Sequence, residues 1–217
     1  MSYQDVMERI TIAAGRVDRD PGDVTVVAVS KSKPVSDIAT LYQAGHRDFG
    51  ENRAQEMEEK AAKLPSDIRW HFVGALQSNK ARLVRPITHL LHSMDRETLA
   101  SAWAKGVGLP PPVLIEVNIG GEPQKAGVLA DEAEGLVSRV VALGLDVRGL
   151  MAIPPAGDDP EERRRHFSAL RDLRDEIRGS HPDVAELSMG MSDDFEVAVE
   201  EGASIIRVGR AIFGART

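Results

Sequence analysis

Short apolar segments of strand type recur eight times along the chain, and helical stretches fill most of the gaps between them. The strand candidates are residues 24–29, 47–50, 68–73, 87–91, 113–118, 147–153, 184–187 and 204–208. Strands that alternate with helices form βαβ units, in which a parallel sheet is covered by the helices. Eight such units predict an α/β fold of the closed (β/α)8, TIM-barrel type. An open doubly wound sheet is the alternative, but no G-x-G-x-x-G motif follows the first strand candidate to mark a dinucleotide-binding sheet.

The chain length favours a single domain. The 217 residues lie at the small end for a (β/α)8 barrel and leave little room for anything else. Ahead of the first strand, Val6, Ile10, Ala13 and Val17 recur at helical spacing. We therefore expect one domain over residues 1–217, with an extra N-terminal helix within residues 1–20 and the barrel over 24–217.

Composition excludes several classes of function. The chain has no cysteine, which rules out disulfides and thiolate chemistry. A net charge of −7 without a basic run argues against nucleic acid or an anionic membrane as a partner. The six histidines show no metal-ligand spacing, and neither a signal peptide nor a membrane-length apolar window is visible. We expect a cytoplasmic, monomeric protein without a metal.

A lysine follows the first strand candidate. The run Val24-Thr25-Val26-Val27-Ala28-Val29 is apolar and β-branched, as in a strand buried on both faces, and Ser30-Lys31-Ser32-Lys33-Pro34 comes directly after it. Barrel enzymes place their chemistry at the carboxyl ends of the strands. Lys31 is therefore a candidate for function, although a solvated lysine at a strand end is the ordinary explanation.

The segments after the last two strands have the features of a phosphate site. Barrels of this type commonly bind phosphate between these two loops, at the amino end of a short helix. Ser188-Met189-Gly190-Met191-Ser192 and Val208-Gly209-Arg210 provide small residues and a hydroxyl there. Ser192 is expected to start a helix, where its hydroxyl serves as an N-cap, a ligand to phosphate, or both.

Three other polar residues allow more than one interpretation. Arg207 lies inside an apolar strand, where a guanidinium needs either a structural ion pair or a bound anionic or heteroatom ligand. Glu51 is either an acid or base or a first-turn glutamate that complements a helix dipole. His71 lies on a strand and is interpreted as a satisfied interior residue rather than a base.

Six segments, in order, resemble the signatures of the pyridoxal phosphate homeostasis protein family. They are Ala28-Val29-Ser30-Lys31-Ser32-Lys33-Pro34, Phe49-Gly50-Glu51-Asn52, residues 71–80 (HFVGALQSNK), Gly149-Leu150-Met151-Ala152-Ile153, residues 187–194 (LSMGMSDD) and residues 207–214 (RVGRAIFG). The resemblance runs from about residue 24 to the C-terminus. It implies a single-domain barrel like the N-terminal domain of alanine racemase, with pyridoxal 5′-phosphate as the cofactor.

The resemblance also assigns roles to individual residues. It implies that Lys31 forms a Schiff base with the cofactor and that Arg207 faces the pyridine nitrogen. The phosphate would be held by Ser192, Gly209 and the neighbouring backbone, while Asn52 and Met151 would line the ring. The family usually has Thr or Ser where this chain has Arg210, so the guanidinium either removes a hydroxyl contact or replaces it with a charged one.

The same residues favour a carrier over an enzyme. An arginine beside the pyridine nitrogen disfavours protonation of that nitrogen, which weakens the ring as an electron sink. Racemisation also needs a second acid or base, and the only tyrosines, Tyr3 and Tyr42, do not follow a predicted strand. We therefore assign no catalytic residue.

We expect a protein of pyridoxal phosphate (vitamin B6) homeostasis, with an indirect effect on amino-acid homeostasis and apo-enzymes as acceptors of the cofactor. The alternatives are a pyridoxal phosphate-dependent amino-acid racemase of the alanine racemase type and, further off, a phosphate-sugar barrel enzyme without this cofactor. Lys33 and Lys80 lie near the expected mouth and either form a positive rim or are solvated loop lysines.

Overall fold

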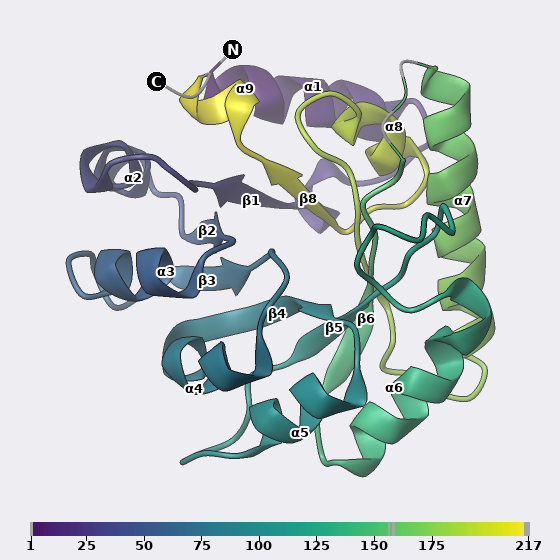
Figure 1. Ribbon diagram of the computed structural model, residues 1–217. Coiled ribbons are helices and arrows are strands. Elements are labelled where there is room, and N and C mark those ends of the chain that lie inside the picture. The colour runs from purple at the N-terminus through teal and green to yellow at the C-terminus, as the bar shows by residue number, and fades with distance from the viewer. Residues whose placement is uncertain (1, 156, 158, 215–217) are drawn as a thin grey trace.

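Eight parallel strands close into a barrel in the order β1 to β8, with β8 pairing back to β1 (Figure 1). The computed structural model describes residues 2–155, 157 and 159–214. The strands are β1 (Thr25–Val29), β2 (Asp48–Glu51), β3 (Arg69–Phe72), β4 (Thr88–Met94), β5 (Val113–Glu116), β6 (Val147–Met151), β7 (Glu186–Ser188) and β8 (Ile205–Val208). The predicted (β/α)8 barrel is thus confirmed, and the alternative prediction of an open sheet is wrong. Residues 1, 156, 158 and 215–217 of the predicted domain lie outside the described part.

One α-helix precedes the first strand, and an α-helix follows every strand. They are α1 (Tyr3–Gly15), α2 (Val35–Gln43), α3 (Ala54–Ala61), α4 (Ala81–Val84), α5 (Glu97–Ala104), α6 (Ala133–Ala142), α7 (Pro160–Ile177), α8 (Phe195–Glu200) and α9 (Arg210–Phe213). Two helix starts predicted from sequence are too early. The helix expected from Glu51 begins at Ala54, because Glu51 is still part of β2, and the helix expected from Ser192 begins at Phe195.

The N-terminal helix α1 packs on the outside of the barrel. Val6, Ile10, Ala13 and Ala14 form its buried face. Arg9 Nε donates to Glu196 Oε1 at 3.0 Å, which joins α1 to α8. Val17, predicted to continue the helical stripe, comes after the end of α1 and is exposed. Figure 1 shows α1 lying beside α8 and α9. The extra helix therefore covers the side of the barrel where β8 pairs with β1 and closes the sheet.

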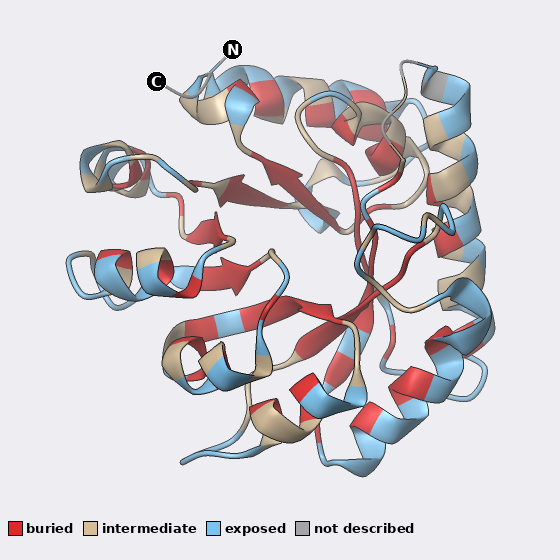
Figure 2. Cartoon of the chain, viewed as in Figure 1, coloured by how far each residue is buried: buried red, intermediate tan, exposed pale blue. Residues whose placement is uncertain are grey.

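The core has two layers, as expected for strands whose successive side chains point to opposite sides. The outer layer lies between strands and helices, and buried residues fill both the strands and the inward faces of the helices (Figure 2). The inner layer fills the barrel and includes Val27, Leu90, Leu114, Met151 and Ile205. Because side chains fill the interior, the barrel offers open space at its ends rather than through its centre.

Candidate functional site

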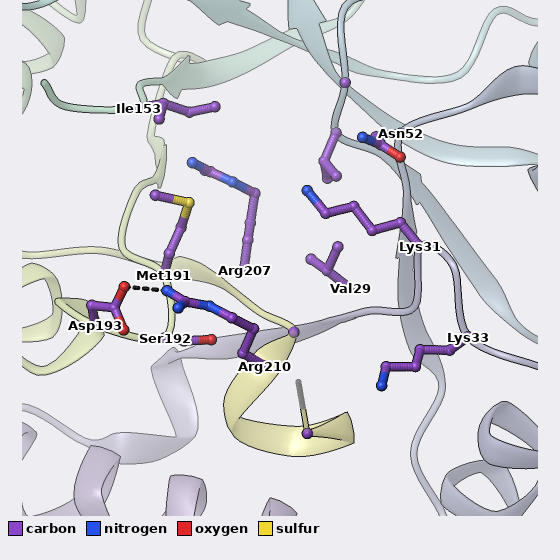
Figure 3. A pocket seen from close by; sticks show the side chains of 14 residues that line it. Val29, Lys31, Lys33, Asn52, Ile153, Met191, Ser192, Asp193, Arg207 and Arg210 are labelled. Atoms are coloured by element: carbon purple, nitrogen blue, oxygen red, sulfur yellow. Dashed lines mark hydrogen bonds and ion pairs between the residues drawn. The ribbon is translucent and has the colours of Figure 1, made fainter. Parts of the chain in front are cut away.

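A cavity of about 640 Å³ lies at the carboxyl ends of the strands. Six of the seven residues predicted to bind the cofactor line it: Lys31, Asn52, Ser192, Arg207, Gly209 and Arg210. Its volume is typical of small-molecule sites. In Figure 3 the labelled side chains among them come from opposite walls of the cavity, so segments far apart in the sequence meet here.

Met151 is the predicted site residue that does not line the cavity. Its side chain is fully buried in the inner layer of the core. Strand β6 ends at Met151, and Ile153, two residues further on, lines the cavity instead. The sequence pattern extended this strand to Ile153 and so gave no sign that the chain leaves the barrel wall earlier.

Lys31 lies two residues after the end of β1, which is at Val29. Ser30, just before it, is fully buried, and Ser32, just after it, has a positive φ of 62°. A non-glycine residue in this left-handed region costs free energy unless the surroundings hold it there. Figure 3 shows Lys31 extending into the cavity on the side of Arg207. The backbone on both sides of Lys31 is therefore constrained, and this constraint directs the Lys31 side chain into the cavity.

The constraint comes from a buried lysine on α3 that the sequence analysis did not single out. Lys60 is 5% exposed, and its Nζ donates to the Ser30 carbonyl oxygen at 2.8 Å. The same ammonium donates to Glu51 Oε1 and to Glu56 Oε1, each at 2.7 Å. The Ser32 N–H in turn donates to Glu56 Oε1 at 2.6 Å. Lys60, Glu51 and Glu56, here called the Lys60 cluster, thus hold the chain before and after Lys31.

Glu51 belongs to this cluster and is neither a first-turn helix residue nor part of the cavity wall. It is fully buried at the end of β2, and Ser30 Oγ donates to its Oε1 at 2.7 Å. Burial raises the pKa of Glu51, although hydrogen bonds from Lys60 and Ser30 act in the opposite direction. The first-turn helix interpretation of Glu51 is therefore wrong, because Glu51 ends β2. Glu51 is not among the described residues that line the cavity and instead anchors Lys60 of α3.

Arg207 reaches the cavity from inside the barrel. It is 4% exposed, and its guanidinium donates to the Ser188 carbonyl oxygen at 2.7 Å and the Ala152 carbonyl oxygen at 2.9 Å. Burial lowers the pKa of Arg207 to about 10, while the carboxylates of Glu116 and Asp194 raise it. Arg207 therefore stays charged at neutral pH, and no described carboxylate forms a direct ion pair with it.

Across the cavity from Lys31, the wall is formed by Ser192 and the start of α9. Ser192 Oγ accepts from the Ala211 N–H at 3.3 Å, and Gly209 caps α9. Ser192 is therefore not the cap of α8, a position that Asp194 occupies. The first N–H groups of any helix lack intrahelical acceptors and attract anions. A hydroxyl and backbone N–H groups thus converge here, as expected for a phosphate site.

Arg210 lies at the rim and forms an exposed ion pair with Asp193, drawn as a dashed line in Figure 3. Lys33 also lines the cavity, and its Nζ donates to the Phe213 carbonyl oxygen at 2.9 Å. Lys80 lies in the turn before α4 and is not among the residues that line the cavity. Of the two lysines expected at the mouth, the structure thus brings only Lys33 to the site.

Two glycines at strand ends are explained by backbone packing. A Cβ on Gly74 would lie 2.7 Å from the Asn52 carbonyl oxygen, and a Cβ on Gly209 would lie 3.0 Å from the Val29 carbonyl oxygen. The approach at Gly74 is closer than a Cβ tolerates, and the approach at Gly209 is tighter than most Cβ contacts. Each glycine lets one cavity-lining segment pack directly on its neighbour.

Glu116 introduces a pH dependence close to the site. It ends β5, is 7% exposed, and its Oε2 has no hydrogen-bond partner among the described residues. Burial and the nearby Asp95 raise the pKa of Glu116 to about 7, against the opposite effect of Arg207. The folded protein therefore binds more protons than the unfolded chain between about pH 4 and pH 7. The contribution of Glu116 to stability falls as pH rises through that window.

Replacing Glu116 with glutamine should therefore raise the free energy of unfolding at pH 8 by about 1–3 kcal/mol, since one pKa unit corresponds to about 1.4 kcal/mol. At pH 4.5 the same variant should differ little from the parent, because Glu116 is protonated there in the folded state. Urea unfolding at both pH values measures this difference. The exposed Glu132→Gln variant is the matched control, and an equal effect of both substitutions would contradict the assignment.

The fold and the strand-end residues together define a class of protein, a (β/α)8 barrel with a small-molecule cavity at the carboxyl ends of its strands. The family model described as "Alanine racemase, N-terminal domain" matches residues 6–217. The chain is 42% identical to the pyridoxal phosphate homeostasis protein of Aquifex aeolicus, over 97% of this chain and 95% of that protein. The chain belongs to the pyridoxal phosphate homeostasis protein family. The match begins at residue 6 rather than near residue 24 as expected, so the N-terminal helix is part of the shared fold.

Solved structures agree with this assignment. PipY of Synechococcus elongatus, in the structure with pyridoxal phosphate bound, is 37% identical and has a TM-score of 0.82. The aligned region covers 96% of this chain and 100% of that one. Alanine racemase of Corynebacterium glutamicum shares the fold at 18% identity and a TM-score of 0.73, and the aligned region covers 61% of its chain.

Other expectations bear on what the protein contacts. The relatives are named for homeostasis rather than for a reaction, in agreement with the expectation of a non-enzymatic role. None of the helices that the structure describes is both long and apolar enough to cross a membrane. Within the same residues, no group of three or more His, Cys, Asp or Glu side chains is placed to hold a metal ion.

Proposed function

We propose that this protein binds pyridoxal 5′-phosphate in the cavity, held as a Schiff base on Lys31, and acts as an intracellular carrier that maintains the pool of this cofactor. The observation that carries the proposal is the arrangement of an amine, a charged guanidinium and a hydroxyl-lined helix start around one cavity. When bound, the cofactor supplies a reactive aldehyde and an electron-withdrawing ring.

The residues present fit each part of this cofactor. Lys31 offers the amine, and its loop is fixed by the Lys60 cluster, which limits the positions that the amine can adopt. Arg207 offers a charged donor toward the ring nitrogen and disfavours a proton on it. Ser192 and the start of α9 offer donors to the phosphate. Arg210 adds positive charge at the rim, because an exposed ion pair such as that with Asp193 costs little to break.

The lining of the cavity favours a carrier over a racemase. Racemisation needs a second acid or base facing the substrate. Apart from Lys31 and the arginines Arg207 and Arg210, the acids and bases among the described lining residues are Lys33 and Asp193. Lys33 bonds to the end of α9, and Asp193 pairs with Arg210. Neither is placed as a partner for proton transfer.

The proposal extends to the cellular context. A carrier of this kind would act as a monomer in the cytoplasm, deliver the cofactor to apo-enzymes that depend on it, and influence amino-acid pools indirectly.

The test is the absorption spectrum of the purified protein with pyridoxal phosphate, before and after borohydride reduction. We expect a visible band that disappears on reduction, with the added mass on the peptide that contains Lys31. A colourless protein without label at Lys31 would instead support a phosphate-sugar enzyme. Turnover of L- or D-alanine that is lost in Lys31→Ala would refute the carrier and support a racemase.

A further inference from the structure

Buried polar side chains form a continuous path through the barrel interior, from its amino end to the cavity. The path consists of Asp48 on β2, His71 on β3, His92 on β4, Ser188 on β7 and Arg207 on β8, and every one of them is buried. Interior positions of such barrels are usually filled by apolar side chains. Polar groups are costly to bury unless they are hydrogen-bonded. A path built from five strands therefore needs a physical explanation.

The hydrogen bonds along the path have one consistent direction. Arg207 Nη1 donates to Ser188 Oγ at 2.6 Å, and a guanidinium can only donate. The Ser188 hydroxyl can then donate to His92 Nδ1, 2.8 Å away. His92 Nε2 lies 2.9 Å from His71 Nδ1, and His71 Nε2 lies 3.1 Å from Asp48 Oδ1. With a proton on Nε2 of each ring, every bond on the path has one donor and one acceptor.

The charges at the two ends agree with this direction. Burial alone raises the pKa of Asp48, but hydrogen bonds from Arg69 and His71 lower it below its ordinary value, so Asp48 is an anionic acceptor. Arg69 Nε holds Asp48 Oδ1 at 2.7 Å at the amino end of the barrel. Burial lowers the pKa of His92, and the nearby guanidinium of Arg207 acts in the same direction. A neutral His92 thus separates the guanidinium from the rest of the path.

We infer that Ser188, His92 and His71 are positioning residues for Arg207, which fix its guanidinium from inside the barrel and present it to the cavity as a charged donor. Two carbonyl oxygens hold the guanidinium from the wall side, and Ser188 Oγ holds it from the interior. This inference deepens the proposed function and rests on it, because it concerns the group that faces the cofactor's ring nitrogen. It requires His92 to be a neutral Nε2–H tautomer.

Ser188→Ala and His92→Leu, made in the full-length protein, test the inference. We expect pyridoxal phosphate affinity to fall about tenfold in Ser188→Ala, which loses one charge-assisted hydrogen bond. It should fall by a smaller factor in His92→Leu, which removes the neutral acceptor of the Ser188 hydroxyl. The absorption maximum of the bound cofactor should move in both variants. Ser188→Thr keeps the hydroxyl and should retain both the affinity and the absorption maximum of the parent protein. His89→Gln is the control, since the His89 ring contacts His71 but is exposed and has no hydrogen bond on the path.

A second readout does not depend on the cofactor. Nitrogen-15 spectra of the histidine side chains, recorded without pyridoxal phosphate, should show His92 as the Nε2–H tautomer, and Ser188→Ala should change the His92 Nδ1 signal. The Nδ1–H tautomer in the parent protein, or unchanged affinity and spectrum in Ser188→Ala, would overturn the inference. If His92→Leu does not fold, Ser188→Ala decides, because it removes a single oxygen.

The two readouts also separate this inference from the proposed function. A parent protein that binds no pyridoxal phosphate, or that is not labelled at Lys31, refutes the proposed function. The inference fails separately when the parent protein binds the cofactor at Lys31 but Ser188→Ala has the affinity and spectrum of the parent, or His92 is the Nδ1–H tautomer.

Discussion

Lys60→Met is expected to lower the free energy of unfolding by about 3–5 kcal/mol, because it leaves a buried carboxylate without its partner. Glu51 is fully buried, and its Oε2 already lacks a hydrogen-bond partner among the described residues. Losing the ammonium removes the 2.7 Å ion pair and also the donor to the Ser30 carbonyl oxygen. Urea unfolding of parent and variant at neutral pH measures the loss.

A second substitution tests whether the buried charge is the cause. Replacing a buried ion pair by apolar residues of similar size is often close to neutral. Lys60→Met combined with Glu51→Leu should therefore recover most of the stability that Lys60→Met loses. Lys63→Met, on an exposed lysine just after the end of α3, is the control and should change stability by less than about 0.5 kcal/mol. A similar small effect of Lys60→Met would contradict the role given to the Lys60 cluster.

The two Lys60 variants also separate the effect of the Lys60 cluster on stability from its effect on the position of Lys31. The double variant regains apolar packing but not the hydrogen bond from Lys60 to the Ser30 carbonyl oxygen. Glu56, which accepts from the Ser32 N–H, also loses the ammonium that holds it in place. The backbone at Ser32 would then keep its positive φ with fewer contacts to support it. We expect the double variant to be folded but to react more slowly with pyridoxal phosphate than the parent. Equal rates would show that the Lys60 cluster stabilises the fold without positioning Lys31.

The fold could be predicted because the sequence pattern that indicates it, a strand followed by a helix, occurs eight times. Eight apolar segments with helices between them specify a closed barrel even when individual ends are misplaced, as at Glu51 and Ser192. The errors lie at element ends, where one polar residue suits both a strand end and a helix start. Only tertiary packing decides between them.

Much of the site could also be predicted, because strand order alone brings the strand ends together. Lys31, Ser192 and Arg207 meet in one cavity for this reason. The contribution of Lys60 could not be predicted, since a lysine in a charged helix resembles a solvated one until the helix packs on β2. Met151 shows the same limit, because whether a side chain faces the cavity or the core depends on where its strand ends.

Lys31→Ala is expected to abolish borohydride labelling and to lower pyridoxal phosphate affinity at least 100-fold, which corresponds to about 2.7 kcal/mol. Lys33 provides a matched comparison two residues away, since both lysines line the same cavity. In Figure 3 Lys31 extends into the cavity, whereas Lys33 points toward α9. Lys33→Ala should therefore keep full labelling at Lys31, with affinity lowered only about two- to fivefold by the lost positive charge.

The residual binding of Lys31→Ala distinguishes the amine from the phosphate end of the site. Ser192, Gly209 and the start of α9 are intact in that variant, so weak non-covalent binding should remain and should be displaced by inorganic phosphate. Equilibrium dialysis with and without phosphate measures it. Labelling that persists in Lys31→Ala, or that disappears in Lys33→Ala instead, would reverse the roles of the two lysines. The geometry argues against that reversal, because the Lys33 Nζ is bonded to the last turn of α9.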